Sequence, residues 1–68
     1  MEKIQIKEDF IRLDSLLKFA GIVYTGGHAK IIIQNGEVKV NGAVCTMRGK
    51  KIYRGDTVEF DSKGITVE

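Results

Sequence analysis

The apolar residues of this chain change their spacing twice along its 68 residues, and this change constrains the fold more than any other feature. Ile4 and Ile6 alternate with polar residues, which is the spacing of a short strand. Between residues 10 and 20 apolar residues recur every three or four positions, as on one face of a helix. A second helical stretch follows, and the alternation returns after Gly36. The pattern predicts a small α+β domain in which a short strand and two helices precede a run of antiparallel strands.

The first predicted helix begins after Asp9, whose carboxylate is suited to cap the free amide groups of a helix start. Gly21 follows the last apolar position, where a residue with left-handed backbone ends many helices. The apolar stripe expected to face the core consists of Phe10, Leu13, Leu16, Leu17 and Ala20.

The second predicted helix begins after Thr25, a good N-cap residue, and ends at Gly36. The connector 22–24 is apolar and is expected to pack beneath both helices. At least one of the two tyrosines, Tyr24 and Tyr53, is expected to lie in the core. The narrower apolar stripe of this helix consists of Ala29, Ile32 and Ile33.

The last third of the chain has the pattern of short antiparallel strands joined by tight turns. Asn41-Gly42, between two alternating segments, is a strong signal for a type I′ hairpin. Residues 61–64 are suited to the turn of a last hairpin. Cys45, on the strand that returns from the first hairpin, is expected to be a small core residue.

The sequence offers few groups for catalysis or metal binding. His28 and Cys45 are its only histidine and cysteine, whereas a structural zinc site needs about four such ligands. No third group is placed to orient the two as a base and a nucleophile. We therefore expect no enzyme, no metal and no cofactor.

Hydropathy and cysteine usage bear on membrane association and on the cellular compartment of the chain. No segment approaches the roughly 20 apolar residues of a membrane span, so no membrane contact is expected. A single cysteine cannot form an intramolecular disulfide, which favours the reducing cytoplasm. We expect one domain that covers residues 1–68 and acts as a monomer.

The net charge of +2 hides an uneven distribution. Residues 12–54 carry eight lysines and arginines against two acidic residues, whereas residues 1–11 and 55–68 are both net acidic. The central segment therefore predicts an electropositive surface that would attract a polyanion. The alternative is that these side chains only solvate the surface.

The stretch from Thr25 to Lys30 is the most informative candidate site. A helix N-terminus offers free amide groups and a partial positive charge, so it attracts phosphate. Gly26 and Gly27 leave those amide groups uncovered, while His28 adds a donor and Lys30 lies one turn further on. The alternative is that the two glycines allow close packing of the helices.

A second basic group follows the first hairpin. Arg48, Lys50 and Lys51 are expected close together on one loop. Arg54 comes shortly after them, and Lys39 is expected on the outward face of the preceding hairpin. Like charges held together repel one another, and a bound polyanion would relieve that repulsion. A solvated basic loop is the alternative.

From Arg12 to Phe60 the order of these signals resembles the S4-like RNA-binding domain. The start of the second helix, residues 25–30, is similar to that of the small stand-alone bacterial members of that family. The matching positions are Arg12-Leu13-Asp14, Leu17, Gly21, Thr25, Ala29, Ile33, Gly36, Val38-x-Val40-Asn41-Gly42 and Gly55-Asp56-x-Val58.

The resemblance implies the αL motif, in which two packed helices are followed by a small antiparallel sheet. It also implies an RNA-contacting role for Arg12 and a cap role for Thr25. Gly26 and Gln34 depart from the family, in which basic residues are common at these positions. Together with the other basic and turn residues, the candidate interface comprises Arg12, Thr25, Gly26, Gly27, His28, Lys30, Lys39, Asn41, Arg48, Lys50, Lys51 and Arg54.

The expected function is non-catalytic recognition of structured RNA, ribosomal or tRNA-like, in association with the ribosome or translation. Few aromatic residues are available to stack single-stranded bases, which favours phosphate and shape contacts to a folded RNA. Two alternatives remain open. One is duplex DNA, whose phosphates would be captured in the same way. The other is a protein-interaction adaptor that docks through the acidic C-terminal hairpin around Glu59 and Asp61.

Overall fold

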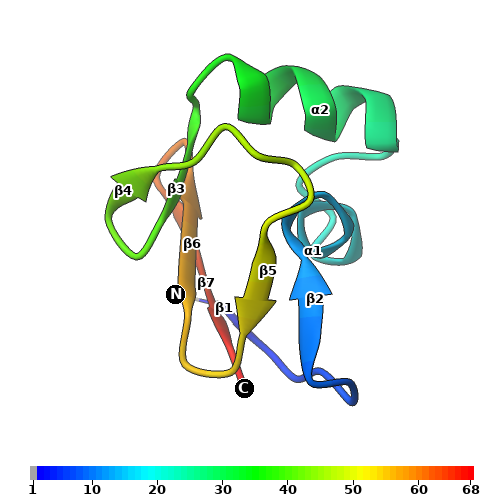
Figure 1. Cartoon of the computed structure of the whole chain (residues 1–68), viewed down its shortest axis with the longest axis vertical. Helices are drawn as coiled ribbons and strands as arrows, with labels where there is room; N and C mark the ends of the chain where they lie inside the picture. The colour runs from blue at the N-terminus through cyan, green and yellow to red at the C-terminus, as the bar shows by residue number, and fades with distance from the viewer. Residues whose placement is uncertain (1) are drawn as a thin grey trace.

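Two helices pack against one face of a sheet in the computed structural model, which describes residues 2–68 (Figure 1). The predicted α+β class is confirmed. In chain order the elements are β1 (Glu2–Ile4), β2 (Phe10–Arg12), α1 (Leu13–Phe19), α2 (Gly26–Gln34), β3 (Val38–Val40), β4 (Ala43–Val44), β5 (Lys51–Tyr53), β6 (Thr57–Phe60) and β7 (Lys63–Val67).

The main sheet is mixed, with strand order β1-β7-β6-β3-β4. Strands β3, β4, β6 and β7 pair antiparallel, as predicted, but β1 pairs parallel with β7 and places Ile4 beside Val67. The amide of Glu68 donates to the Ile4 carbonyl at 2.8 Å and extends this pairing. Parallel strands need a long crossover connection, which the helices and the other strands supply here. The N-terminal strand β1 therefore forms one edge of the main sheet, next to the C-terminal strand β7.

A separate two-stranded ribbon joins β2 to β5, in antiparallel register with Ile11 opposite Ile52. The prediction that residues 10–12 belong to the first helix is wrong, and so is the prediction that Asp9 caps it. The helix begins at Leu13, with Arg12 as an extended N-cap that makes no side-chain cap. Aromatic and β-branched residues favour strands, and residues 10 and 11 find a strand partner about 40 positions away in sequence.

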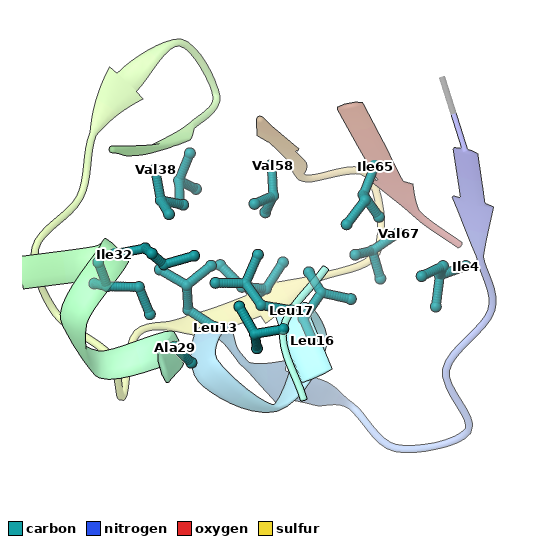
Figure 2. Packing of buried hydrophobic residues seen from close by; sticks show 14 residues of the cluster. Ile4, Leu13, Leu16, Leu17, Ala29, Ile32, Val38, Val58, Ile65 and Val67 are labelled. Carbon is teal, nitrogen blue, oxygen red and sulfur yellow. The ribbon is translucent and has the colours of Figure 1, made fainter. Parts of the chain in front are cut away.

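The core lies between the helices and the inner face of the sheet, as Figure 2 shows. Alternate residues of β3, β6 and β7 point into it, and the intervening ones lie on the other side of the sheet. The predicted stripe of α2 is buried as expected, whereas in the predicted stripe of the first helix only the three leucines are fully buried. The buried residues are Ile4, Leu13, Leu16, Leu17, Val23, Ala29, Ile32, Ile33, Val38, Val40, Ile52, Val58, Ile65 and Val67.

The predicted C-terminal end of the first helix and the first hairpin turn are confirmed. Gly21 has a φ of 76° directly after the last turn of α1, which favours a residue without a Cβ. Asn41 and Gly42 both have positive φ, as a type I′ turn requires. The last hairpin turn is tighter than predicted, because Asp61 and Ser62 alone occupy it with positive φ.

The connector between the helices buries less than predicted. Val23 lies in the core and Ile22 is half-buried, but Tyr24 is 90% exposed. Tyr53 is 48% exposed, so the expectation of a core tyrosine is wrong. Cys45 is half-buried and packs against the core, with its Sγ 3.7 Å from the Met47 carbonyl oxygen.

Candidate nucleic-acid interface

The start of α2 presents free backbone donors. Thr25 is the N-cap, as predicted, and its hydroxyl accepts a hydrogen bond from the amide of His28 at 3.0 Å. The amides of Gly26 and Gly27 have no acceptor within residues 2–68. These two donors belong to the positive end of the helix dipole and are exposed to solvent.

The two glycines are not required by helix packing. A Cβ placed on Gly26 would meet no atom within 4 Å, and one on Gly27 would meet only the Thr25 hydroxyl, at 3.9 Å. The alternative explanation, that they allow the helices to approach, is therefore contradicted. What the glycines do provide is an unobstructed path to the two amides, beside the exposed side chains of His28 and Lys30.

The start of α1 is closed by the loop that leads into β5. The amide of Leu13 donates to the Lys50 carbonyl at 2.8 Å, and the amide of Asp14 donates to the Arg48 carbonyl at 3.0 Å. These bonds satisfy donors that a helix start leaves free, so this end of α1 is not an anion site. They also hold the basic loop against α1.

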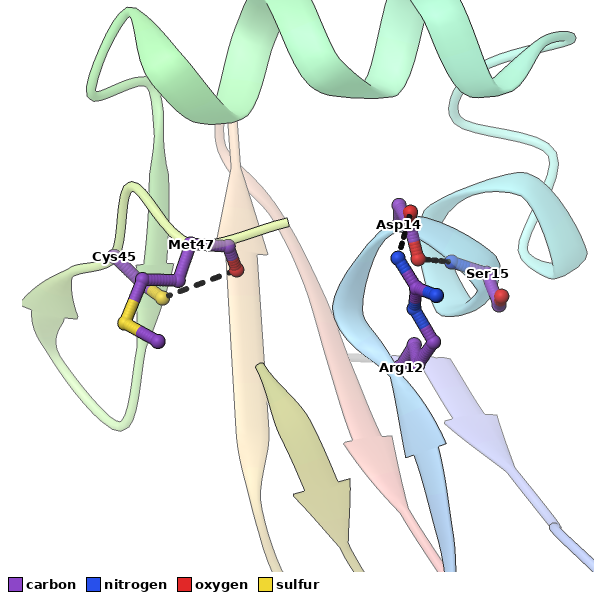
Figure 3. A network of polar contacts seen from close by, with 5 residues as sticks. All are labelled: Arg12, Asp14, Ser15, Cys45 and Met47. Carbon is purple, nitrogen blue, oxygen red and sulfur yellow. Dashed lines mark hydrogen bonds and ion pairs between the residues drawn. The ribbon is translucent and has the colours of Figure 1, made fainter. Parts of the chain in front are cut away.

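Arg12 is held by its neighbour Asp14, as Figure 3 shows. Its Nη2 lies 3.1 Å from Asp14 Oδ2, and the other carboxylate oxygen accepts from the Ser15 amide at 2.8 Å. The Arg12 side chain is still 53% exposed. A partly exposed ion pair of this kind contributes about 0–1 kcal/mol to stability, so its main consequence is to orient the guanidinium.

Four of the predicted site cations lie on the basic loop and on the two strand ends that adjoin it. Arg12 lies opposite Lys51 in the ribbon, and its Nη2 lies 3.7 Å from the position that a Cβ on Gly49 would occupy. Lys50 and Arg48 flank that glycine. All four side chains are exposed. We call Arg12, Arg48, Lys50 and Lys51 the loop cluster.

Three predicted site residues, Lys39, Asn41 and Arg54, belong neither to the loop cluster nor to the start of α2. Lys39 stands between buried Val38 and Val40, so it points to the outer face of the sheet, opposite Glu59. Asn41 uses its amide internally. The Nδ2 group donates to Asp56 at 3.1 Å, and Oδ1 accepts from the Thr57 amide at 2.9 Å.

Arg54 is also placed elsewhere. It follows the far end of β5, at the opposite end of the molecule from α2 (Figure 1). Its Nη2 donates to the Ile6 carbonyl at 2.8 Å, which ties down the segment between β1 and β2. Arg54 and Asn41 therefore make hydrogen bonds within the protein. Lys39 lies on the outer face of the main sheet, opposite Glu59.

Sequence reasoning missed the outer face of the β2–β5 ribbon, which carries Phe10 and Tyr53 beside the loop cluster. The signal was present, because Phe10 and Arg12 alternate around Ile11, and Lys51 and Tyr53 alternate around Ile52. It was hidden because neither segment reveals its partner strand.

No group of three or more His, Cys, Asp or Glu side chains in residues 2–68 is arranged to hold a metal ion. None of the helices in that range is long and apolar enough to cross a membrane.

Comparison with known proteins agrees with this architecture. The chain is 43% identical over 61 residues to "Putative RNA-binding protein YbcJ" of Escherichia coli (strain K12), covering 90% of this chain and 87% of that protein. It is 39% identical over 61 residues to "Probable ribosome maturation protein RlbA" of Bacillus subtilis (strain 168), covering 90% and 86% respectively.

A solved structure shares the fold. The solution structure of YbcJ from E. coli, described as revealing an alfaL motif involved in RNA-binding, matches with a TM-score of 0.75 at 40% identity. The match covers 98% of this chain and 86% of that one. The predicted αL arrangement of two packed helices followed by strands is thereby confirmed. A family model described as S4 domain matches residues 4–68, and the chain therefore belongs to the S4 domain family.

Proposed function

We propose that this chain is a non-catalytic domain that binds structured RNA, ribosomal or tRNA-like, through phosphate and shape contacts. The observation that carries the proposal is the start of α2, where two glycines that packing does not require leave two amides uncovered. Backbone amides at a helix N-terminus are a favoured site for phosphate.

The loop cluster supplies a second point of contact. Its four exposed cations have only one carboxylate in ion-pair contact among residues 2–68, that of Asp14. A phosphate held at Gly26 and Gly27 and others held by the loop cluster would fix a nucleic-acid backbone at two places. Double-stranded RNA offers shape, phosphates and 2′-hydroxyls rather than readable base edges, and this arrangement suits that form of recognition.

The relatives support the same partner and setting. One is named for RNA binding and another for ribosome maturation, and both align over most of their length. We propose on this basis that the domain acts in the cytoplasm, as a monomer, in association with the ribosome or with translation.

A competition experiment tests the partner. A labelled RNA duplex is bound to the protein and then displaced by unlabelled RNA or DNA duplex of the same length and sequence. We expect the RNA duplex to compete more strongly, because only RNA has the A-form groove and the 2′-hydroxyls. Equal competition would identify a general duplex binder, and no binding of either would refute the proposal.

A double variant tests the site. Lys30→Ala combined with Lys50→Ala removes one exposed cation from α2 and one from the loop cluster, and we expect weaker RNA binding. Lys39→Ala combined with Lys63→Ala is the matched control. It removes the same charge from the sheet and the last hairpin. Equal loss of affinity in both double variants would contradict the proposed interface.

A further inference from the structure

The β2–β5 ribbon has one face in the core and one in solvent. Ile52 is fully buried, and Ile11 opposite it packs against the core. Because side chains alternate along a strand, the flanking residues point the other way. The outer face of the ribbon, which we call the ribbon face, consists of Phe10, Arg12, Lys51 and Tyr53.

The ribbon face combines two aromatic rings with two cations. The rings of Phe10 and Tyr53 lie 6.0 Å apart between centroids and are inclined at 52°. Lys51 Nζ sits 4.8 Å from the centroid of the Phe10 ring. Arg12 stands at the end nearest the basic loop, against Gly49. The ribbon face is therefore continuous with the loop cluster, since Arg12 and Lys51 belong to both.

Tyr53 is the more accessible of the two rings. Lys51 covers Phe10, which is half-buried, whereas Tyr53 keeps 48% of its surface exposed. An exposed ring next to cations is the arrangement with which proteins hold unpaired nucleotides, because the ring stacks on a base while the cations neutralise the adjoining phosphates. Bases paired in the interior of a helix are stacked on both sides and offer no free face.

We propose that Tyr53 stacks on an unpaired base of the bound RNA while Arg12 and Lys51 hold the neighbouring phosphates. This inference rests on the RNA binding proposed above and narrows the ligand. The RNA carries an unpaired nucleotide next to the helical segment that α2 and the loop cluster hold.

Tyrosine fluorescence tests the stacking directly. The chain has no tryptophan and two tyrosines, so Tyr24→Phe leaves Tyr53 as the only fluorescent side chain. Tyr24 is 90% exposed, and the exchange preserves its ring. The probes are a blunt RNA duplex and the same duplex with a short unpaired adenine extension. We expect the extended RNA to quench Tyr53 and to bind more tightly, and the blunt duplex to leave the fluorescence unchanged.

Affinity measurements on a second variant complete the test. Tyr53→Leu should lower affinity for the extended RNA about 5- to 100-fold, as loss of one base–aromatic stack does, and leave the blunt duplex unaffected. Tyr53→Phe keeps the ring and should keep the preference. Phe19→Leu, which removes another exposed ring at the end of α1, is the matched control and should change neither affinity.

The possible outcomes separate the two proposals. If both RNAs bind equally and Tyr53 is not quenched, the stacking inference is wrong and the proposed function stands. If Tyr53→Leu lowers the melting temperature but leaves the preference unchanged, the aromatic pair serves only the ribbon. If the wild-type protein binds neither RNA, both proposals fail.

Discussion

Gly26 and Gly27 occupy the first turn of α2, where alanine would be the better helix former. Glycine is less favourable than alanine by about 1 kcal/mol inside a helix. No neighbouring group is close enough to exclude a Cβ at either position. Because neither helix stability nor packing accounts for these two glycines, we explain them by the approach of a ligand to their backbone amides. The Thr25 cap has the complementary role, since it fixes the helix start and uses only the third amide.

Replacement of Gly26 by alanine should change stability and RNA binding in opposite directions. Gly26→Ala should raise the free energy of unfolding by up to about 1 kcal/mol, because alanine favours the helix. The same variant should bind the RNA duplex more weakly, because the methyl group stands in the path of the phosphate. Urea unfolding and duplex titration measure the two effects.

Gly21→Ala is the control for this pair of measurements. Its φ of 76° is unfavourable for alanine, so it should lower the free energy of unfolding and leave RNA affinity of the folded protein unchanged. A Gly26→Ala protein that is more stable and binds RNA as well as the wild type would exclude the amide site.

Helix α2 could be predicted from the sequence, and the start of α1 could not. The cap, the glycines and the apolar stripe of α2 all lie within residues 25–36, so local signals determine it. Phe10 is spaced correctly for the helical stripe of Leu13 and Leu17, and its pairing with Tyr53 depends on a residue far away in sequence. The candidate site divides in the same way. The start of α2 was found from the sequence, whereas the ribbon face depends on long-range pairing.

Long-range pairing also could not be predicted for β1. Its alternating pattern predicted a strand, but not that the strand pairs with β7. Ile4 is 5% exposed and stands beside Val67 at the parallel edge of the sheet. We expect Ile4→Ala to lower the free energy of unfolding by about 2–4 kcal/mol, because it removes buried methyl groups at the strand that closes the core. Lys3→Ala, on the outer face of the same strand, should change it by less than about 0.5 kcal/mol.

Urea unfolding of the two β1 variants is the measurement. A domain of this size has a total stability of at most about 5 kcal/mol, so the Ile4 variant should retain only about 1–3 kcal/mol and unfold at a much lower urea concentration than the wild type. Similar stability of the two variants would mean that β1 adds little to the fold in solution.

In the folded protein, several acidic side chains are engaged by neighbouring groups. Asp14 and Asp56 lie within the basic segment or next to it, but both are engaged by neighbouring groups. Asp14 holds Arg12, and Asp56 accepts from Asn41 and from the Tyr53 amide. Glu59 faces Lys39 on the outer face of the sheet. Within the loop cluster only Arg12 has an ion-pair partner among residues 2–68, although the net charge of the chain is only +2.

This distribution of charge predicts how binding responds to salt. If about four to six phosphates are engaged, the slope of log affinity against log salt concentration should be roughly −3 to −5. Lys50→Ala should make the slope shallower by about one, because one phosphate contact is lost. Lys39→Ala removes the same charge from the other face and should leave the slope unchanged. Titrations of an RNA duplex over a series of salt concentrations measure all three slopes. Were the Lys39 and Lys50 variants to give the same slope, net charge rather than its arrangement would control binding, and the loop cluster would have no special role.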